Sequence, residues 1–201
     1  MRAVAVREDI KDLILDAAER LLVRYGFKKM TMDDLAQEIG IAKGTIYLHF
    51  SSKEEIALSR VDRVIDRLYE ELWKIARSKE NPSDRLQAML MTRVLFRFDS
   101  VQHYAESIDE QMATIRPALE ARRKKYFEKE AQILVQVLQE GKRQKVFFFE
   151  EAGYTAHTLL VATNALLPSK LKAVELKNRQ NIEKRISQIS RLLVNGLSVK
   201  N

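Results

Sequence analysis

The sequence predicts an all-α protein, and three observations point to that class. Its 201 residues include only six glycines and three prolines, which are too few for the many turns of an all-β protein. Apolar residues recur three and four positions apart, as in Ile10, Leu13, Ile14 and Ala17. Residues that cap or stop helices separate these periodic segments. We therefore expect about nine helices in succession and no β-sheet.

Clear start and stop signals bound the first two helices. The periodic run that includes Ile10 should end at Gly26, because glycine readily adopts the left-handed conformation that terminates a helix. Thr31 should cap a second helix over residues 32–39, and two aspartates in its first turn suit the helix dipole. Gly40 should end this second helix in a tight turn.

A third short helix follows that turn almost at once. The apolar pattern resumes at Ile41 and continues to Phe50. Two short helices joined through a glycine turn form a helix-turn-helix, and the small Ala36 would let them approach closely. The exposed face of a recognition helix needs hydrogen-bond donors and close backbone access. The residues expected on that face are Lys43, Gly44, Thr45, Tyr47 and His49.

The segment from Met32 to Glu55 reads MDDLAQEIGIAKGTIYLHFSSKEE, and it resembles the DNA-binding domain of the tetracycline-repressor (TetR) family of bacterial regulators. The Lys-Gly-Thr, Tyr-x-His-Phe and Lys-Glu elements within it form a specific signature. The resemblance implies a helix-turn-helix DNA-binding domain over residues 1–52. It also implies a helical effector-binding and dimerisation domain over residues 53–201.

The resemblance further implies a role for each matched position. Lys43, Gly44 and Thr45 would face the DNA major groove. Other residues would contact phosphates, which position a protein without specifying sequence. Ala42 stands where many family members have Ser or Thr, so we expect neither a side-chain cap nor a DNA contact there. The implied phosphate contacts are Thr31, Tyr47, His49 and Lys53.

Plainer interpretations of these residues stay open. Thr31 could serve only as a helix cap, and Lys43 could be a solvated lysine. Tyr47 could be partly buried, and His49 could be an ordinary surface histidine.

Further helices fill the rest of the chain. Ser52 with Glu55 forms a capping box that should open the fourth helix, and Asn81 with Pro82 favours the start of the fifth. The apolar run at residues 146–149 has strand propensity, but with no partner strand we expect a buried loop or helix junction. The expected ranges are residues 53–79, 82–98, a short helix to about 114, 117–141, 150–167 and 175–196.

The last two of these helices resemble the pair through which TetR-family members form homodimers. A two-fold dimer would match a palindromic operator. Packing inside one chain would explain the same apolar residues equally well. The candidate interface residues are Leu159, Leu160, Thr163, Leu166, Leu167, Ile186, Ile189 and Leu193.

The resemblance also implies an effector pocket within the C-terminal helices. Polarity could come from Arg93, Arg97, His103 and Asn164, although we expect both arginines on a solvated face. Plain core packing is the alternative for the apolar candidates. The candidate lining residues are Trp73, Met89, Phe96, Tyr104, Met112, Tyr126 and Phe127.

The distribution of charge does not by itself point to DNA. The net charge is +7, yet residues 1–60 contain ten Lys or Arg and ten Asp or Glu, so the excess lies in the C-terminal part. Basic segments at residues 116–145 and 166–201 favour an anionic, apolar effector such as a fatty acyl compound. Solvated lysines on helix surfaces would explain the same excess.

The sequence lacks the residues that several kinds of catalytic and metal-binding site require. The chain has no cysteine, which excludes disulfides, a thiol nucleophile and Cys-based metal sites. Three scattered histidines and no phosphate-binding glycine loop leave no catalytic, metal or cofactor site to predict. With no long apolar run or signal peptide, we expect a cytoplasmic protein with no membrane partner.

The sequence therefore predicts a non-enzymatic, ligand-responsive transcriptional regulator. We expect a homodimeric repressor that a small apolar effector releases from a palindromic double-stranded DNA operator. The alternative is a helical lipid-binding or scaffold module with a vestigial helix-turn-helix.

Overall fold

The computed structural model describes residues 2–102 and 108–199, with side chains for residues 10–102, 114–172 and 174–199. It divides into two compact units. Unit 1 comprises Met1–Arg63 and His103–Glu120, and unit 2 comprises Val64–Gln102 and Ala121–Asn201. The described residues form nine α-helices and no strand, so the expected all-α class is confirmed. No helix among them is long and apolar enough to cross a membrane.

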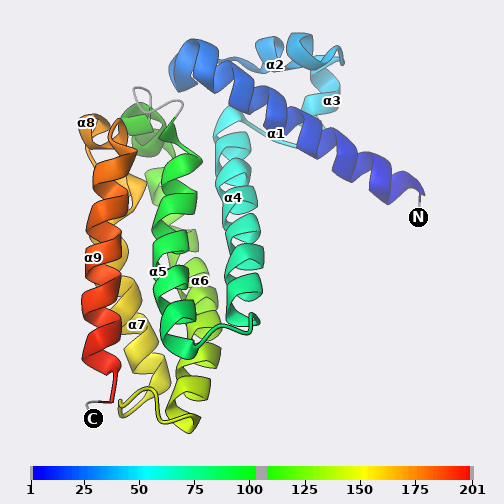
Figure 1. Ribbon diagram of the computed structural model, residues 1–201. Helices are drawn as coiled ribbons and strands as arrows, with labels where there is room; N and C mark the ends of the chain where they lie inside the picture. The colour runs from blue at the N-terminus through cyan, green and yellow to red at the C-terminus, as the bar shows by residue number, and fades with distance from the viewer. Residues whose placement is uncertain (1, 103–107, 200–201) are drawn as a thin grey trace. The chain divides into compact units, whose positions relative to one another are not determined.

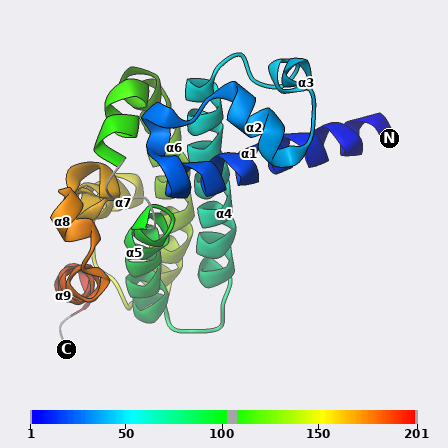
Figure 2. The same cartoon turned by 90° about the horizontal axis from the view of Figure 1, so that it is seen from above.

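Unit 1 contains α1 (Arg2–Lys29), α2 (Met32–Ile39) and α3 (Lys43–Tyr47), which Figure 2 shows from above. The break predicted at Gly26 is present, because this residue has a φ of 75° and interrupts the helical backbone of α1. The core combines apolar residues of all three helices with the first turns of α4 (Lys53–Ala76). Its fully buried side chains include Ile14, Leu35, Ile46 and Ile56.

Capping fixes both ends of α2. The Thr31 hydroxyl accepts a hydrogen bond from the Asp34 backbone N–H at 3.1 Å, and the Asp34 carboxylate accepts one from the Thr31 N–H at 2.9 Å. Gly40 ends α2 with a left-handed φ of 69°, as predicted. Ala42 precedes α3 without a side-chain cap, also as predicted.

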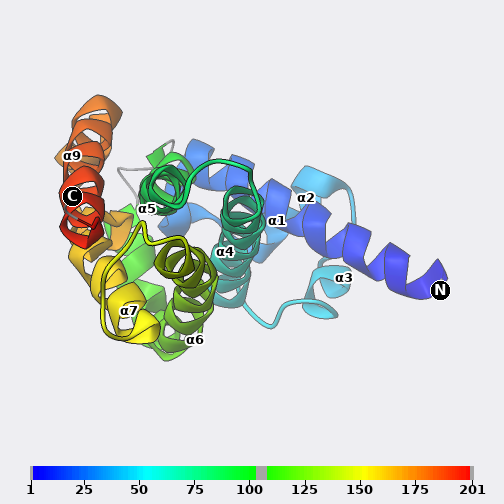
Figure 3. The same cartoon turned by 60° about the horizontal axis from the view of Figure 1, so that its bottom comes forward.

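Unit 2 is a bundle of long helices that run side by side in Figure 1 and are seen closer to end-on in Figure 3. Helix α9 packs against α5 and α7. The elements are α5 (Pro82–Asp99), α6 (Ile108–Arg143), α7 (Ala152–Thr163), α8 (Ala173–Leu176) and α9 (Arg179–Leu197), and both α4 and α6 contribute residues to each unit.

The division of residues 108–143 into two helices was wrong. Pro117 lies inside the single helix α6, where its side chain is exposed. Proline removes one backbone hydrogen bond, yet the helix continues on both sides of it. The predicted helix over residues 150–167 was too long, since α7 ends at Thr163 and two 3₁₀ turns follow, Asn164–Leu166 and Pro168–Lys170.

The apolar run at residues 146–149 is a loop, as expected, but one part of it is exposed. Phe147 and Phe149 are buried, whereas Phe148 is 78% exposed. Phe147 forms an isolated antiparallel bridge with Ser198. The Phe148 N–H donates to the Leu197 carbonyl at 2.8 Å, so the loop is tied to the end of α9.

Candidate functional site

The helix-turn-helix in unit 1 presents a polar and accessible surface on α3. Ile46 and Phe50 are buried against the unit 1 core, as predicted for the inner side of the motif. Lys43 and Gly44 are exposed, and Thr45 is half-buried. A Cβ added at Gly44 would meet no atom within 4 Å, so its backbone is open to a partner.

Lys43 is oriented by an ion pair with α2. Its ammonium lies 2.7 Å from an Asp33 carboxylate oxygen. The hydrogen bond to Asp33 raises the pKa of Lys43 above its ordinary value. Lys43 is therefore charged at neutral pH and points toward the start of α2.

The C-terminal end of α3 adds an aromatic and an apolar group to this surface. Tyr47 is 49% exposed and His49 is half-buried. Leu48 is 83% exposed, a position that sequence reasoning missed because the residue looked like part of the apolar pattern. An exposed aliphatic side chain of this kind can contact the methyl group of thymine in a major groove.

Two of the residues predicted to contact phosphates, Thr31 and Lys53, already form hydrogen bonds within the chain. Thr31 is exposed but caps α2. The Lys53 ammonium donates to the carbonyls of Phe27, Lys28 and Met30 at 3.1, 3.2 and 3.3 Å. These three bonds use every N–H of the ammonium and stabilise the end of α1.

Ion pairs also tie α1 to α4 within unit 1. The Arg63 guanidinium lies 2.7 Å from the Asp16 carboxylate and 3.4 Å from that of Asp12. Arg20 similarly binds Glu38 of α2 at 2.8 Å. These contacts hold the helices that carry the motif in a fixed arrangement.

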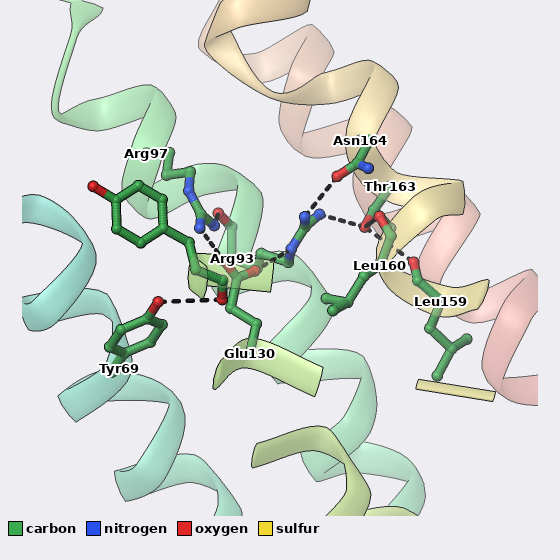
Figure 4. A network of polar contacts seen from close by, with 9 residues as sticks. Tyr69, Arg93, Arg97, Glu130, Leu159, Leu160, Thr163 and Asn164 are labelled. Carbon is green, nitrogen blue, oxygen red and sulfur yellow. Dashed lines mark hydrogen bonds and ion pairs between the residues drawn. The ribbon is translucent and has the colours of Figure 1, made fainter. Parts of the chain in front are cut away.

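A buried polar network occupies unit 2 and joins α5, α6 and α7 (Figure 4). Arg93 donates to the Glu130 carboxylate at 2.5 Å, to the Thr163 hydroxyl at 2.7 Å and to the Asn164 side-chain oxygen at 2.6 Å. Arg97 binds the other oxygen of Glu130. The expectation of a solvated face for Arg93 and Arg97 was wrong, because their side chains are only 2% and 13% exposed.

Charge pairing decides the ionisation of this network. Burial alone would raise the pKa of Glu130, but the charges of Arg97 and Arg93 outweigh it and hold that pKa below its usual value. Burial lowers the pKa of Arg93 to about 10, which leaves it charged at neutral pH. Burial also raises the pKa of Tyr69, whose hydroxyl donates to the Tyr126 carbonyl at 3.2 Å. Paired charges of this kind fix three helices rather than perform acid–base chemistry.

The predicted effector residues that the structure describes are spread over α4, α5 and α6. Met89 is fully buried in the unit 2 core, while Trp73, Phe96, Tyr126 and Phe127 are half-buried. Met112 belongs to α6, but its side chain is not among those described, and His103 and Tyr104 lie outside the described residues. Their role stays a prediction.

One surface pocket of about 450 Å³ lies in unit 2 and involves none of those candidates. It is formed by the end of α4, the following turn and the start of α5. Four of its seven lining residues are charged, but the surface that the lining presents to the pocket is mostly apolar. The lining residues are Lys74, Ile75, Ser78, Glu80, Asp84, Arg85 and Ala88.

Most predicted interface residues lie inside unit 2. Leu159, Leu160, Thr163, Leu166 and Ile186 are at most 2% exposed, and Leu167 is 9% exposed. Ile189 and Leu193 of α9 are half-buried. The large apolar side chains that α7 and α9 leave exposed are others, namely Tyr154, Val161 and Leu192 at 77%, 61% and 66%.

Comparison with known proteins supports this assignment of the motif. Residues 14–59 match the model of the bacterial regulatory proteins of the tetR family. The chain is 31% identical over 91 residues to the transcriptional repressor KstR2 of Mycobacterium tuberculosis, a match covering 45% of this chain and 44% of the relative. It is 42% identical over 60 residues to the regulator EthR of Mycolicibacterium smegmatis, covering 30% and 28%. The chain thus spans less than half the length of these curated relatives.

Solved structures extend the likeness to nearly the whole fold. A TetR-family transcriptional regulator from Pectobacterium atrosepticum superposes with a TM-score of 0.76 at 17% identity, over 98% of this chain and 97% of that one. A transcriptional regulator from Cytophaga hutchinsonii gives 0.74 at 18% identity, over 94% and 98%. Residues 14–59 therefore carry the sequence signature of the bacterial regulatory proteins of the tetR family, and the chain as a whole resembles solved regulators in fold.

Proposed function

We propose that the chain is a ligand-responsive, DNA-binding transcriptional regulator whose unit 1 binds a double-stranded operator. The observation that carries this proposal is α3, which packs into the motif through the buried Ile46 and leaves Lys43, Gly44 and Tyr47 accessible. Lysine can donate to guanine O6 and N7, and an open glycine lets the backbone approach DNA. The retained surface weighs against a vestigial motif in a lipid-binding or scaffold module.

The proposed active form is a homodimer. Two copies related by a two-fold axis would place two α3 helices on the half-sites of a palindromic operator. Helices α7 and α9 support this proposal, because they expose the large apolar side chains of Tyr154, Val161 and Leu192, and exposed apolar side chains of this kind are candidates for protein contacts. These three side chains extend the interface expected from sequence.

The proposed regulation is repression relieved by a small apolar effector bound within unit 2. KstR2, one of the relatives, is a repressor by name. An effector releases DNA only if it binds the DNA-incompetent state more tightly than the competent one. A coupling of about 1–3 kcal/mol would lower operator affinity by roughly 5- to 150-fold.

The direct test is a fluorescence-anisotropy titration of the purified protein onto its own upstream intergenic DNA. A scrambled duplex of equal length and composition serves as the control. We expect tight binding to the upstream DNA that weakens as salt rises, because phosphate contacts release counterions. Equal, weak binding to both duplexes, repeated with fragments selected from the whole genome, would contradict the proposal.

A further inference from the structure

Asp33 lies in the first turn of α2 and faces the one lysine of the helix-turn-helix. Residues 31–50 contain three acids, Asp33, Asp34 and Glu38, and a single Lys or Arg, Lys43. Asp34 is engaged in the cap of α2, and Glu38 binds Arg20. Asp33 is the acid whose carboxylate meets the Lys43 ammonium, at 2.7 Å.

The exposure of this pair indicates that stability is not its purpose. The side chains of Lys43 and Asp33 are 45% and 69% exposed. Solvent screens such pairs, so they contribute little to folding. The pair does fix where the Lys43 ammonium lies, on the surface that the proposed function assigns to DNA.

We infer that Asp33 is a specificity-determining residue, which restrains Lys43 from binding DNA phosphates indiscriminately and so favours contacts to base edges. The inference rests on the proposed function. A phosphate that approaches Lys43 meets the negative carboxylate of Asp33 at the same time, and like charges repel. The acceptors of guanine in the major groove carry no formal charge, so Asp33 penalises them much less.

The donor count of lysine allows this arrangement. An ammonium has three N–H donors, and Asp33 occupies one of them. The remaining donors can reach a base while the ion pair persists. Residues 1–60 carry equal numbers of acidic and basic residues, which agrees with a DNA-binding unit whose general attraction to phosphates is held low.

The test compares Asp33→Asn with the wild-type protein. Each is titrated by fluorescence anisotropy onto a duplex that the wild type has selected from random sequences and onto a scrambled version of it. Asparagine keeps the shape of aspartate but removes the charge that repels phosphate. We expect affinity for the scrambled duplex to rise about fivefold while affinity for the selected duplex changes less, so that selectivity falls.

Asp12→Asn is the matched control. Asp12 lies on α1 and pairs with Arg63 rather than with the motif, and its loss changes the net charge of unit 1 by the same amount. It should raise affinity for both duplexes equally and leave their ratio unchanged. If Asp33→Asn behaves like Asp12→Asn, the inference is overturned and the proposed function stands.

A double-mutant cycle with Lys43→Gln separates an action through Lys43 from a direct effect of Asp33 on DNA. In the Lys43→Gln background, Asp33→Asn should leave the selectivity ratio unchanged. A drop in selectivity that persists without Lys43 would contradict the inference. Failure of the wild type to select any duplex would overturn both the inference and the proposed function.

Discussion

Glu130 is the residue on which the buried network of unit 2 depends most. It accepts hydrogen bonds from Arg93 and Arg97, and loss of its charge would leave two buried guanidinium groups without their counterion. Glu130→Gln should therefore lower the free energy of unfolding by about 3–5 kcal/mol, measured by urea denaturation. Glu128→Gln, which changes an exposed carboxylate on the same helix, is the control and should cost far less.

Titration of the Glu130 carboxylate should also contribute to the pH dependence of the free energy of unfolding. Arg97 and Arg93 hold the pKa of Glu130 below its usual value of 4.5, so the folded state binds this proton less readily than the unfolded state. Its contribution is complete above pH 4.5 and is lost as the pH falls through the lower pKa of the folded state. Urea titrations across this acidic range should show a smaller loss for Glu130→Gln than for the wild type. Parallel curves for the two proteins would contradict this account.

Lys53 should be needed for the stability of unit 1. Its ammonium satisfies three carbonyls at the end of α1 and lies 4.8 Å from the centre of the Phe27 ring. Lys53→Met keeps most of the aliphatic stem but removes the donors, so unfolding should become easier by about 1–3 kcal/mol. Lys29→Met removes the same charge from an exposed position and should leave the melting temperature nearly unchanged.

Residue identity alone could locate the motif but not every partner. The roles of Thr31 and Gly40 were predictable, because helix caps and left-handed turns depend on residues that are close in the sequence. Arg93 was misjudged because its partners, Glu130 and Thr163, are 37 and 70 positions away in the chain. No spacing rule links residues so distant, and burial of an arginine becomes visible only after the helices pack.

At the scale of elements, replacement of glycine by alanine should have different effects at Gly141 and at Gly196. A Cβ at Gly141 of α6 would collide with the Phe147 ring, which closes the loop after that helix. Gly141→Ala should therefore destabilise the protein by about 1–3 kcal/mol. Gly196→Ala on α9 meets no neighbour and should be neutral or slightly stabilising in the same thermal melts.

Gly44 of α3 should separate folding from DNA binding. Its position is open, so Gly44→Ala should keep or slightly raise the melting temperature. The added methyl group would stand where DNA approaches the backbone, so operator affinity should fall about tenfold, or about 1.4 kcal/mol. Anisotropy titrations check the affinity, and an unchanged value would remove Gly44 from the interface.

Helix boundaries were predicted correctly where the sequence has strong capping residues. Their prediction failed where the packing of helices determines whether a helix continues. Asn81 and Pro82 marked the start of α5, and the structure confirms that start. The boundary predicted at Pro117 was wrong. Proline usually ends or begins a helix, but here its exposed ring lies within the long α6. The Ser52–Glu55 capping box is half formed, since the Glu55 carboxylate accepts from Ser51 instead of Ser52.

At the scale of the whole molecule, the exposed apolar residues of α7 and α9 predict where two copies meet. Leu192→Glu should convert the proposed dimer into monomers, because a charge buried in an apolar interface lacks a partner. Val174→Glu makes the same change at an exposed valine of α8 and should leave the dimer intact. Sedimentation equilibrium checks both, and a dimeric Leu192→Glu protein would exclude this surface.

The fold class and the motif followed from sequence, whereas the exposure of individual apolar residues on α7 and α9 did not. Apolar periodicity identifies the inner side of a helix, and Leu159 and Leu160 were accordingly apolar because they fill the core of unit 2. The proposed interface would use residues left outside that core, such as Val161, and their exposure depends on how neighbouring helices pack.

Hydroxyl-radical footprinting of the wild-type protein on its selected duplex tests the central claim most directly. Two recognition helices on a two-fold dimer should protect two half-sites of related, inverted sequence, about one helical turn apart or at a related spacing. Lys43→Gln should weaken the protection at both half-sites together. Protection of a single site without symmetry, or no protection at concentrations that saturate binding, would contradict a dimeric regulator that reads DNA through α3.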